Sequence, residues 1–232
     1  MNWIILVPRG AEYQAVMRGL DRRQRAAKSC EGEPSIRAIA IPAGRAVKPW
    51  LTKEFQKEFQ KEFQELASQV EHPLPTHFLV LGLCGGLSDR TRLGRVVLYD
   101  QPDQLNLAQQ LKVQLVQGLT IDRVLCLAAE KKQLAQESKA DVVDMESQWI
   151  VDYVQSFGGR VNVIRVVSDD VMGDLPDLSA AFDTSGDLRP LALALAFMRN
   201  PVAALRLIRG ALIALRQLEE WVAELDLEHL KV

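Results

Sequence analysis

The sequence predicts an α/β fold: a single domain spanning residues 1–232, in which helices cover both faces of a mixed, mainly parallel central sheet as three αβα layers. Short apolar runs typical of buried strands alternate along the chain with polar, helix-like segments. That order favours a largely parallel sheet between helices. The 232 residues, of which 48% are hydrophobic, fit one large domain better than two small ones.

The first half of the chain contains three of the expected strands. Residues 3–7 (WIILV) form a continuous apolar run ended by Pro8, which is typical of a buried parallel strand. A helical pattern begins at Glu12. Further apolar runs predict strands at 36–42 and 78–83.

A repeat, KEFQKEFQKEFQ, occupies residues 53–64. Its phenylalanines recur at helical spacing, so they drift slowly around one face of the expected helix, with Lys and Glu on its solvated sides. An aromatic stripe of this kind serves packing in most proteins, and we assign it no chemistry. The phenylalanines are Phe55, Phe59 and Phe63.

The second half continues the alternation. Apolar runs predict strands at 94–99, 123–127 and 161–167, and a polar, helix-like segment at 105–116 separates the first two. The stretch of about residues 190–232 is expected to form a helical C-terminal extension. In such a sheet the ligand site lies at the carboxyl ends of the strands.

Composition argues against several classes of partner. A formal net charge of -2 gives no reason to expect nucleic acid. Cys30, Cys84 and Cys126 lack the spacing of metal ligands, which suggests reduced thiols, no metal site and a cytoplasmic location. No stretch reaches the roughly 18 apolar residues of a membrane span, and no basic leader precedes the first apolar run. We therefore expect a protein that is soluble or, at most, peripheral to a membrane.

Two acidic stretches follow apolar runs. In 139–149 (KADVVDMESQW) an Asp-Met-Glu sequence follows a short strand signal, and in 165–170 (RVVSDD) apolar residues lead into a serine and two aspartates. Acidic strand ends that face one pocket make a workable pair of acid and hydroxyl acceptor. The alternative is that Glu146 caps the helix starting near Ser147 and that Asp169 caps a turn.

Two other positions invite a functional interpretation. Cys84-Gly85-Gly86 ends the strand at 78–83, and a glycine pair there lets a ligand approach free backbone amides. Alone, such a pair is more typical of a turn. Glu12 likewise fits an acid in the first turn of a helix, where the helix dipole favours it.

Four stretches, in this order and spacing, resemble the successive signatures of the nucleoside phosphorylase and nucleosidase superfamily. They are 3–12 (WIILVPRGAE), 79–97 (LVLGLCGGLSDRTRLGRVV), 140–148 (ADVVDMESQ) and 163–170 (VIRVVSDD). Within the superfamily, the segments AAEKKQLA and DMES and the arginine-rich tail are most similar to the hopanoid-associated phosphorylase branch. Methylthioadenosine/adenosylhomocysteine nucleosidase is the better-known relative.

The resemblance implies an enzyme that cleaves the N-glycosidic bond of a 5'-modified purine nucleoside and releases adenine. In the hopanoid branch this converts adenosylhopane to ribosylhopane. The family fold is a single domain whose sheet closes toward a barrel. A homo-oligomer without a cofactor is expected, with phosphate as the alternative co-substrate to water.

The resemblance also implies the catalytic residues. Asp169 matches the aspartate that protonates or hydrogen-bonds N7 of the purine, Ser168 orients it, and Asp170 is the neighbouring alternative. A proton donor of this kind has to be buried if it is to stay protonated near neutral pH. Glu12 matches the glutamate that activates the attacking water.

For the sugar, the resemblance implies contacts from two segments. Glu146 matches the glutamate that accepts hydrogen bonds from the ribose hydroxyls, and Met145 matches the methionine that packs against the ribose. The loop containing Cys84 and Gly85 matches the one beside the ribose and the nucleophile. Leu83 departs from the pattern, because relatives carry Ser or Thr there.

The nucleophile is left open between water and phosphate. Phosphorolysis needs fixed donors for a dianion, whereas hydrolysis needs one base and a water. Glu12 and the leucine at position 83 favour hydrolysis, while the branch name implies phosphorolysis. A ligand-binding protein that has kept the fold and lost the activity is the alternative from another class.

The tail forms the last candidate site. Apolar residues repeat at helical spacing through 201–221, flanked by Arg206, Arg209 and Arg216, which predicts an amphipathic basic helix. One interpretation is that this stripe packs on the domain. The other is that 191–218 forms a wall for an apolar 5' substituent or rests on an anionic membrane. The stripe consists of Leu205, Ile208, Leu212 and Leu215.

Overall fold

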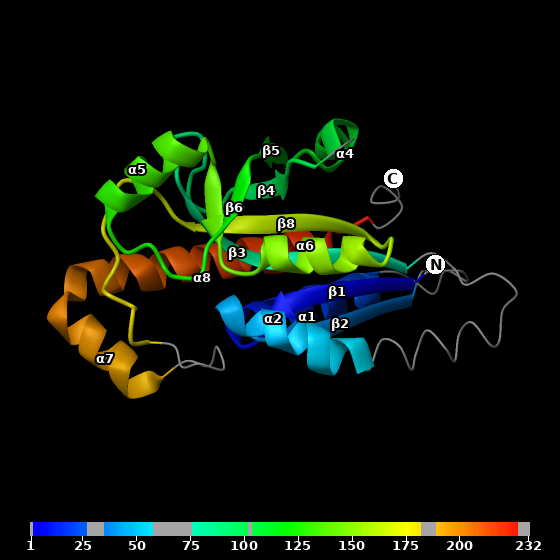
Figure 1. Cartoon of the computed structure of the whole chain (residues 1–232), viewed down its shortest axis with the longest axis horizontal. Helices are drawn as coiled ribbons and strands as arrows, with labels where there is room; N and C mark the ends of the chain where they lie inside the picture. Colours follow the sequence, from blue (N-terminus) through cyan, green and yellow to red (C-terminus); the bar gives the residue numbers. More distant parts are fainter. Residues whose placement is uncertain (1, 27–34, 58–75, 102–103, 182–188, 227–232) are drawn as a thin grey trace, which may run out of the picture.

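The computed structural model describes residues 2–26, 35–57, 76–101, 104–181 and 189–226 (Figure 1). Its centre is a mixed sheet of eight strands in which most neighbouring pairs are parallel, so the predicted sheet type is confirmed. Two pairs are antiparallel, β4 with β8 and β3 with β7. Within the described ranges, no helix has both the length and the apolar character needed to cross a membrane.

The main path of the sheet runs in the order β2-β1-β3-β8-β4-β5, and β7 joins the end of β3 and carries β6. The strands are β1 (Asn2–Pro8), β2 (Ser35–Ile41), β3 (Thr76–Gly86), β4 (Val96–Tyr99), β5 (Gln114–Val116), β6 (Gly118–Thr120), β7 (Val142–Asp144) and β8 (Arg160–Asp169). Because β1, β3 and β8 run parallel, their carboxyl ends meet at one edge.

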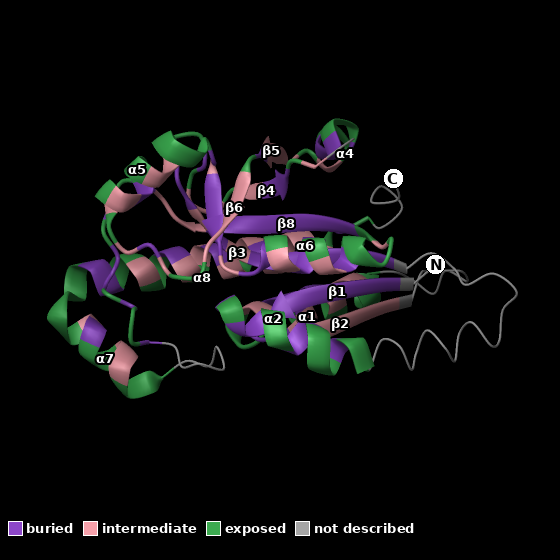
Figure 2. Ribbon diagram, viewed as in Figure 1, coloured by how far each residue is buried: buried purple, intermediate pink, exposed green. Residues whose placement is uncertain are grey.

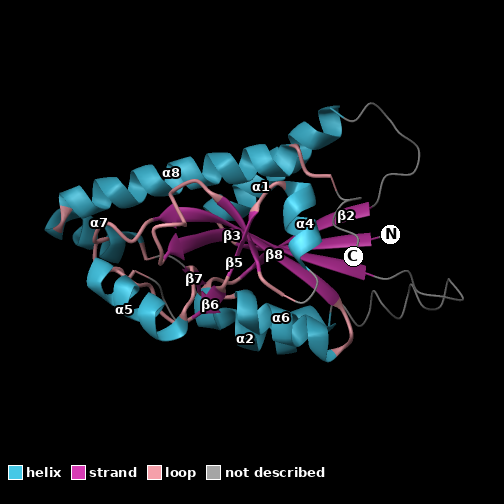
Figure 3. Ribbon diagram, turned by 90° about the horizontal axis from the view of Figure 1, so that it is seen from above, coloured by secondary structure: helices cyan, strands magenta, loops and turns pink. Residues whose placement is uncertain are grey.

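Helices lie on both faces of this sheet (Figure 3). One face carries α1 (Ala11–Ala26) and α8 (Pro201–Ala223). The other carries α6 (Ser147–Ser156) and α2 (Val47–Trp50), which continues as a π-helical segment, η2 (Leu51–Phe55). A 3-10 turn (Gly44–Ala46) and the peripheral helices α4 (Gln104–Leu111), α5 (Ala128–Ser138) and α7 (Pro190–Arg199) complete the described elements.

Alternation along the strands explains the layers. In β1, Ile5 packs in the cluster beneath α1 and α8, whereas its neighbours Ile4 and Leu6 pack in the cluster beneath α6. Successive side chains of a strand point to opposite faces of the sheet. Because helices cover both faces here, both sets of side chains are buried and the strand sequence is apolar throughout. Figure 2 shows β1 and β8 buried between these layers, while α7 is largely exposed.

Most predicted elements are confirmed, and two differ from the structure. The predicted strand at 123–127 is wrong: this segment is irregular, with Leu125 packed against Leu87 and Val143, and it leads into α5. The helix-like segment at 105–116 ends earlier than predicted, because residues Gln114–Val116 form β5 beside β4.

The KEFQ repeat lies mostly outside the described residues. Phe55 is buried and contacts Phe78 and Tyr153, which agrees with a packing role. The predictions for Phe59 and Phe63 fall on residues whose structure is not described.

The predicted helix in the tail is confirmed as α8, but its buried face is not the predicted one. The residues that face the domain are small or lie near its C-terminal end: Ala203, Ala204, Gly210, Ala214, Leu218 and Val222. The predicted stripe stays exposed at Leu205, Ile208 and Leu212. Gly210 lies directly on the carbonyl oxygen of Ser168, where a Cβ would overlap it, so only small side chains allow this approach. Packing of the leucine stripe on the domain is therefore wrong for the N-terminal half of α8.

Candidate active site

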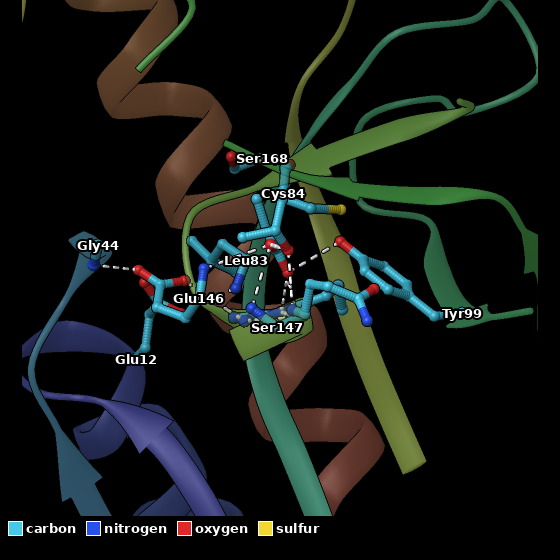
Figure 4. Close-up of polar contacts among 12 residues, drawn as sticks. Glu12, Gly44, Leu83, Cys84, Tyr99, Glu146, Ser147 and Ser168 are labelled. Atoms are coloured by element: carbon cyan, nitrogen blue, oxygen red, sulfur yellow. Dashed lines mark hydrogen bonds and ion pairs between the residues drawn. The ribbon is translucent and has the colours of Figure 1, made fainter. Parts of the chain in front are cut away.

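The acidic residues predicted to form a site come together at the carboxyl edge of the sheet. Glu12 lies in the first turn of α1, which follows β1, Glu146 follows β7, and Asp169 ends β8 (Figure 4 shows the first two). The glycine at position 85 lies near the end of β3 between the β7 and β8 strands. A cluster from four different strands agrees with a ligand site at a sheet edge.

Glu12 is held by the backbone of β3. Its Oε2 accepts a hydrogen bond from the N–H of Leu83 at 2.8 Å. Burial raises the pKa of Glu12 from 4.5 to about 7, although the nearby Arg165 guanidinium opposes the rise. A carboxyl with a pKa near neutral is suited to act as a general base.

Arg165 is a central residue that the sequence analysis did not assign. It is fully buried on β8, and its Nε lies 3.2 Å from Oδ2 of Asp144. Its Nη2 donates to Glu146 at 3.4 Å and to Ser147 at 2.9 Å. Burial works against the guanidinium charge, but Asp144 and Glu146 outweigh it and raise the pKa of Arg165.

The third nitrogen of this guanidinium, Nη1 of Arg165, is buried and has no hydrogen-bond partner among the described residues. It lies against Gly82 of β3. A Cβ at position 82 would overlap both this nitrogen and Oε2 of Glu12. The glycine therefore makes the space in which the carboxylate and the guanidinium face each other.

Asp144 connects the strands beneath the site. It accepts hydrogen bonds from the hydroxyl of Tyr99 at 3.0 Å, from Thr120 at 2.5 Å and from the hydroxyl of Ser147. It also accepts the backbone N–H groups of Glu146 and Ser147 at 3.3 and 3.2 Å, at the start of α6. Asp144 thus caps the helix, and the alternative in which Glu146 caps it is wrong.

The side chain of Glu146 instead faces the loop after β2. Its Oε1 accepts the N–H of Gly44 at 2.6 Å. Burial raises the pKa of Glu146, against the opposing charge of Arg165. Gly44 has a positive φ of 62°, and the methyl carbon of Met145 packs against it. The side chains of Glu146 and Met145 thus both contact the turn at Gly44.

Asp169 and Ser168 form the second half of the site. The Ser168 hydroxyl lies 2.9 Å from Oδ1 of Asp169 and 3.2 Å from the carbonyl oxygen of Cys84. Its single hydrogen can be donated to only one of these two acceptors at a time. Oδ2 of Asp169 forms an ion pair with the buried Lys131 of α5, and Gly85 lies against the same oxygen.

The neighbouring acid, Asp170, has a different role. Its Oδ1 accepts the N–H of Met172 at 3.0 Å, which is the bonding of a turn cap. The turn-capping alternative considered for Asp169 therefore applies to Asp170, whereas the Asp169 carboxylate bonds to Ser168 and Lys131.

The Cys84 side chain is buried in the core cluster beneath α6, and burial raises the pKa of its thiol. The Cys84-Gly85 segment presents main-chain atoms at the site. The carbonyl oxygen of Cys84 lies within hydrogen-bond distance of the Ser168 hydroxyl, and the Cα of Gly85 lies beside Asp169. A substrate contact of this segment remains a prediction, carried by main-chain atoms.

Within the described ranges, no group of His, Cys, Asp or Glu side chains is arranged to hold a metal ion. Among the described residues of the site, two buried cations are paired with acids: the Arg165 guanidinium with Asp144 and Glu146, and the Lys131 ammonium with Asp169. Two acidic clusters, each with one buried cation, therefore face this edge of the sheet. One can accept hydrogen bonds and activate water, and the other can interact with a leaving group.

No protein-family model matches the sequence, and no curated protein matches it. Several solved structures are similar to the chain in fold. Futalosine hydrolase of Helicobacter pylori strain 26695 is similar over 97% of this chain and 98% of its own, with a TM-score of 0.57 and 16% identity. The 5'-methylthioadenosine/S-adenosylhomocysteine nucleosidase of H. pylori is similar over 97% and 99%, with a TM-score of 0.56 and 15% identity.

A putative 5'-methylthioadenosine/S-adenosylhomocysteine nucleosidase from Francisella philomiragia ATCC 25017 is similar over 97% of this chain and 98% of its own, with a TM-score of 0.59 and 14% identity. These proteins belong to the nucleoside phosphorylase/nucleosidase superfamily. Sequence identities this low establish shared architecture and nothing finer. The chain has the fold of these hydrolase and nucleosidase structures, which is the fold that the four sequence stretches predict.

Proposed function

We propose that the protein hydrolyses the N-glycosidic bond of a 5'-modified purine nucleoside and releases adenine. The observation that carries the proposal is Glu12: a carboxyl with a pKa of about 7, held by the Leu83 N–H at the edge where Glu146 and Asp169 also lie. At neutral pH a substantial fraction of Glu12 is ionised, so it can take a proton from an attacking water.

The charges around Glu12 favour water over phosphate as the nucleophile. The guanidinium that acts most strongly on Glu12 is that of Arg165, and it is already paired with Asp144 and Glu146. A phosphate dianion would have to enter beside three carboxyl groups, and like charges at close range are costly in a poorly solvated site. The same carboxylates favour the positive charge that develops on the ribose as the glycosidic bond breaks.

The ribose contact is assigned to Glu146. Its Oε1 accepts the Gly44 N–H, and its other oxygen faces Arg165 at 3.4 Å, so the carboxylate is fixed in place. A fixed acceptor can take hydrogen bonds from the 2'- and 3'-hydroxyls, and Met145 beside it offers an apolar surface to the sugar.

The purine is assigned to the end of β8, where Ser168 and Asp169 lie. Leaving-group activation needs a proton donor at the base, and Asp169 is the acid whose carboxyl is oriented from both sides. Among the structural neighbours, the H. pylori nucleosidase has been crystallised as an aspartate-to-asparagine mutant with 5'-methylthioadenosine in its active site. That complex supports a purine nucleoside as the substrate class.

The 5' substituent is proposed to be apolar. The start of α8 and the loop after β8 border a surface hollow of about 420 Å³ whose lining includes Met172, Val202 and Arg206. Val202 belongs to this lining, and further large apolar side chains of α7 and α8 are exposed: Leu191, Leu195, Met198, Leu205 and Leu212. An apolar patch of this kind marks a binding surface. If the protein acts as the hopanoid-associated branch does, its substrate is adenosylhopane and its product is ribosylhopane.

Three further properties are part of the proposal. The protein is a cytoplasmic homo-oligomer, and the exposed apolar and basic face of α8 brings it to anionic membranes, where a lipid nucleoside would lie. Light scattering tests the oligomer, and vesicle sedimentation tests the membrane contact.

The activity is tested by adenine release. The protein is incubated with 5'-methylthioadenosine, S-adenosylhomocysteine and an adenosine with an apolar 5' group, each with and without phosphate. We expect adenine release that does not depend on phosphate and is fastest with an apolar 5' group. Strict dependence on phosphate would establish phosphorolysis, and tight binding without release would establish a non-catalytic binder.

A further inference from the structure

Lys131 is buried in the first turn of α5, where a cation is unfavourable for two reasons. Its side chain is 1% exposed, so the ammonium has lost its hydration. Its backbone N–H bonds to the Leu127 carbonyl at the start of the helix, where the helix dipole favours negative rather than positive charge. An ammonium in this place requires a strong local partner.

That partner is the proposed acid of the site. Nζ of Lys131 forms an ion pair with Oδ2 of Asp169 and donates to the carbonyl oxygen of Asp170 at 3.1 Å. Asp169 comes 38 positions after Lys131 in the sequence, so α5 folds back onto the end of β8 to form this contact. The contact joins the core of the site to a helix that supplies no other predicted residue.

Other charged groups near this ammonium are engaged elsewhere. Glu130 of the same helix bonds to Arg123 through both of its oxygens, at 3.2 and 2.9 Å. Asp174, from the loop after β8, accepts the N–H of Ala128 at 2.8 Å. The Cys126 thiol lies close enough to feel the charge of Lys131, and burial raises the pKa of that thiol. Asp169 is therefore the carboxylate to which Lys131 can hand a proton.

The pair poses a chemical problem for an acid. A carboxyl group that is ion-paired with an ammonium carries no proton of its own to donate. Asp169 can nevertheless pass one on, because the ammonium beside it has three N–H bonds. The hydrogen bond from Ser168 to Oδ1 keeps the carboxylate oriented while Oδ2 exchanges the proton.

We propose that Lys131 supplies, through Asp169, the proton that the leaving purine needs; this inference rests on the proposed hydrolysis. The oxygen of the attacking water bonds to C1' as the bond between C1' and the purine nitrogen breaks, and the electron pair of the broken bond moves into the purine. Nζ of Lys131 gives a proton to Asp169 and becomes a neutral amine, and Asp169 passes the proton to the purine. The proton of the attacking water goes to Glu12. Exchange with solvent after product release restores Lys131 and Glu12.

The test compares two kinds of leaving group. With 5'-methylthioadenosine the leaving adenine needs a proton, whereas with para-nitrophenyl riboside the leaving phenolate does not. Lys131→Met should lower kcat for the adenine nucleoside by about 10²-fold, a general-acid contribution. The same variant should leave the cleavage of the nitrophenyl riboside unchanged. Lys132→Met is the matched control, since Lys132 is the exposed neighbour on the same helix.

Lys131→Arg separates proton supply from ion pairing. An arginine keeps the positive charge beside Asp169 but cannot give up a proton in a protein. We expect Lys131→Arg to fold like the wild type and to be as slow as Lys131→Met with the adenine nucleoside. Lowering the pH should restore part of the rate of Lys131→Met relative to Lys132→Met, because Asp169 can then take its proton from solvent.

Three results would overturn the inference. Full adenine release by Lys131→Arg would show that the charge alone is required. Equal losses with both substrates would show a structural role. Unchanged kcat in every Lys131 variant would show no role. In each case the wild type still releases adenine, so the proposed function stands. A wild type that cleaves neither substrate would overturn the proposed function itself, and the inference with it.

Discussion

The carboxylate of Glu12 accepts a hydrogen bond from the backbone N–H of Leu83 at 2.8 Å, which joins the first turn of α1 to the carboxyl-terminal part of β3. The donor is main chain, so the leucine side chain at position 83 does not affect it. The departure from the family pattern at this position therefore removes a hydroxyl but leaves the base in place.

The activity should depend on pH through Glu12. Burial raises its pKa to about 7, and only the ionised carboxylate can accept a proton from water. The ionised fraction grows as the pH rises through about 7, so kcat/KM for adenine release should rise over the same interval. A profile measured in overlapping buffers checks this. An acidic limb near the ordinary glutamate value of 4.5 would contradict the assignment.

Asp169→Asn should retain the fold and ligand binding but lose turnover by about 10²-fold or more, because an amide cannot pass a proton to the purine. Initial rates of adenine release, with binding measured by calorimetry, check this. Asp170→Asn is the matched control, since that carboxylate caps a turn and should be nearly silent in kcat. A fully active Asp169→Asn variant would show that Asp169 is not the acid that protonates the purine.

Glu146→Gln should raise KM and lower kcat together. The carboxylate is proposed to bind the ribose hydroxyls in the ground state and to stabilise positive charge in the transition state, so both parameters depend on it. Steady-state kinetics with ribosides and their 2'-deoxy analogues check this. If the wild type cleaves 2'-deoxy substrates as well as ribosides, Glu146 does not have the proposed ribose role.

The exposed stripe on α8 should bind anionic membranes. Leu205 and Leu212 face solvent beside Arg206, Arg209 and Arg216, which suits an anionic lipid surface. We expect sedimentation with anionic but not neutral liposomes at low salt, where electrostatic attraction is strongest. Replacing Arg209 and Arg216 by glutamine should weaken sedimentation without affecting cleavage of a water-soluble nucleoside. Arg206 is kept in this variant, because it lines the proposed 5' site and donates to the carbonyl oxygen of Asp174. A wild type that ignores anionic liposomes at low salt would contradict the membrane contact.

Much of the fold was predictable because its strands are buried on both faces. Unbroken apolar runs such as 3–7 identify these strands from the local sequence alone, even when the neighbouring strands are not known. The segment 123–127 shows the limit of this signal: Leu125 needs burial, but an irregular segment buries it as well as a strand does. In α8 the stripe of leucines predicted the helix but not its buried face, because close contact between Gly210 and β8 selected the small residues.

The site was predictable where its residues form a sequence signature and not where they depend on distant partners. Glu146 and Asp169 follow strand signals directly. Arg165 opens the stretch RVVSDD, but its guanidinium is stabilised by Asp144 at the end of β7 and by Glu146 just after that strand. An arginine inside an otherwise apolar run was the available signal. Lys131 offered none, because its partner lies on a strand that no local pattern connects to α5.

The most direct test of the account is adenine release by Glu12→Gln in phosphate-free buffer, measured beside the wild type with the same 5'-modified nucleoside. We expect the wild type to release adenine together with free reducing ribose ends. The variant should bind the nucleoside with nearly unchanged affinity and release no adenine, because glutamine cannot accept a proton from water. Adenine release by Glu12→Gln at the wild-type rate, or ribose 1-phosphate ends as the required product, would contradict hydrolysis by a Glu12-activated water.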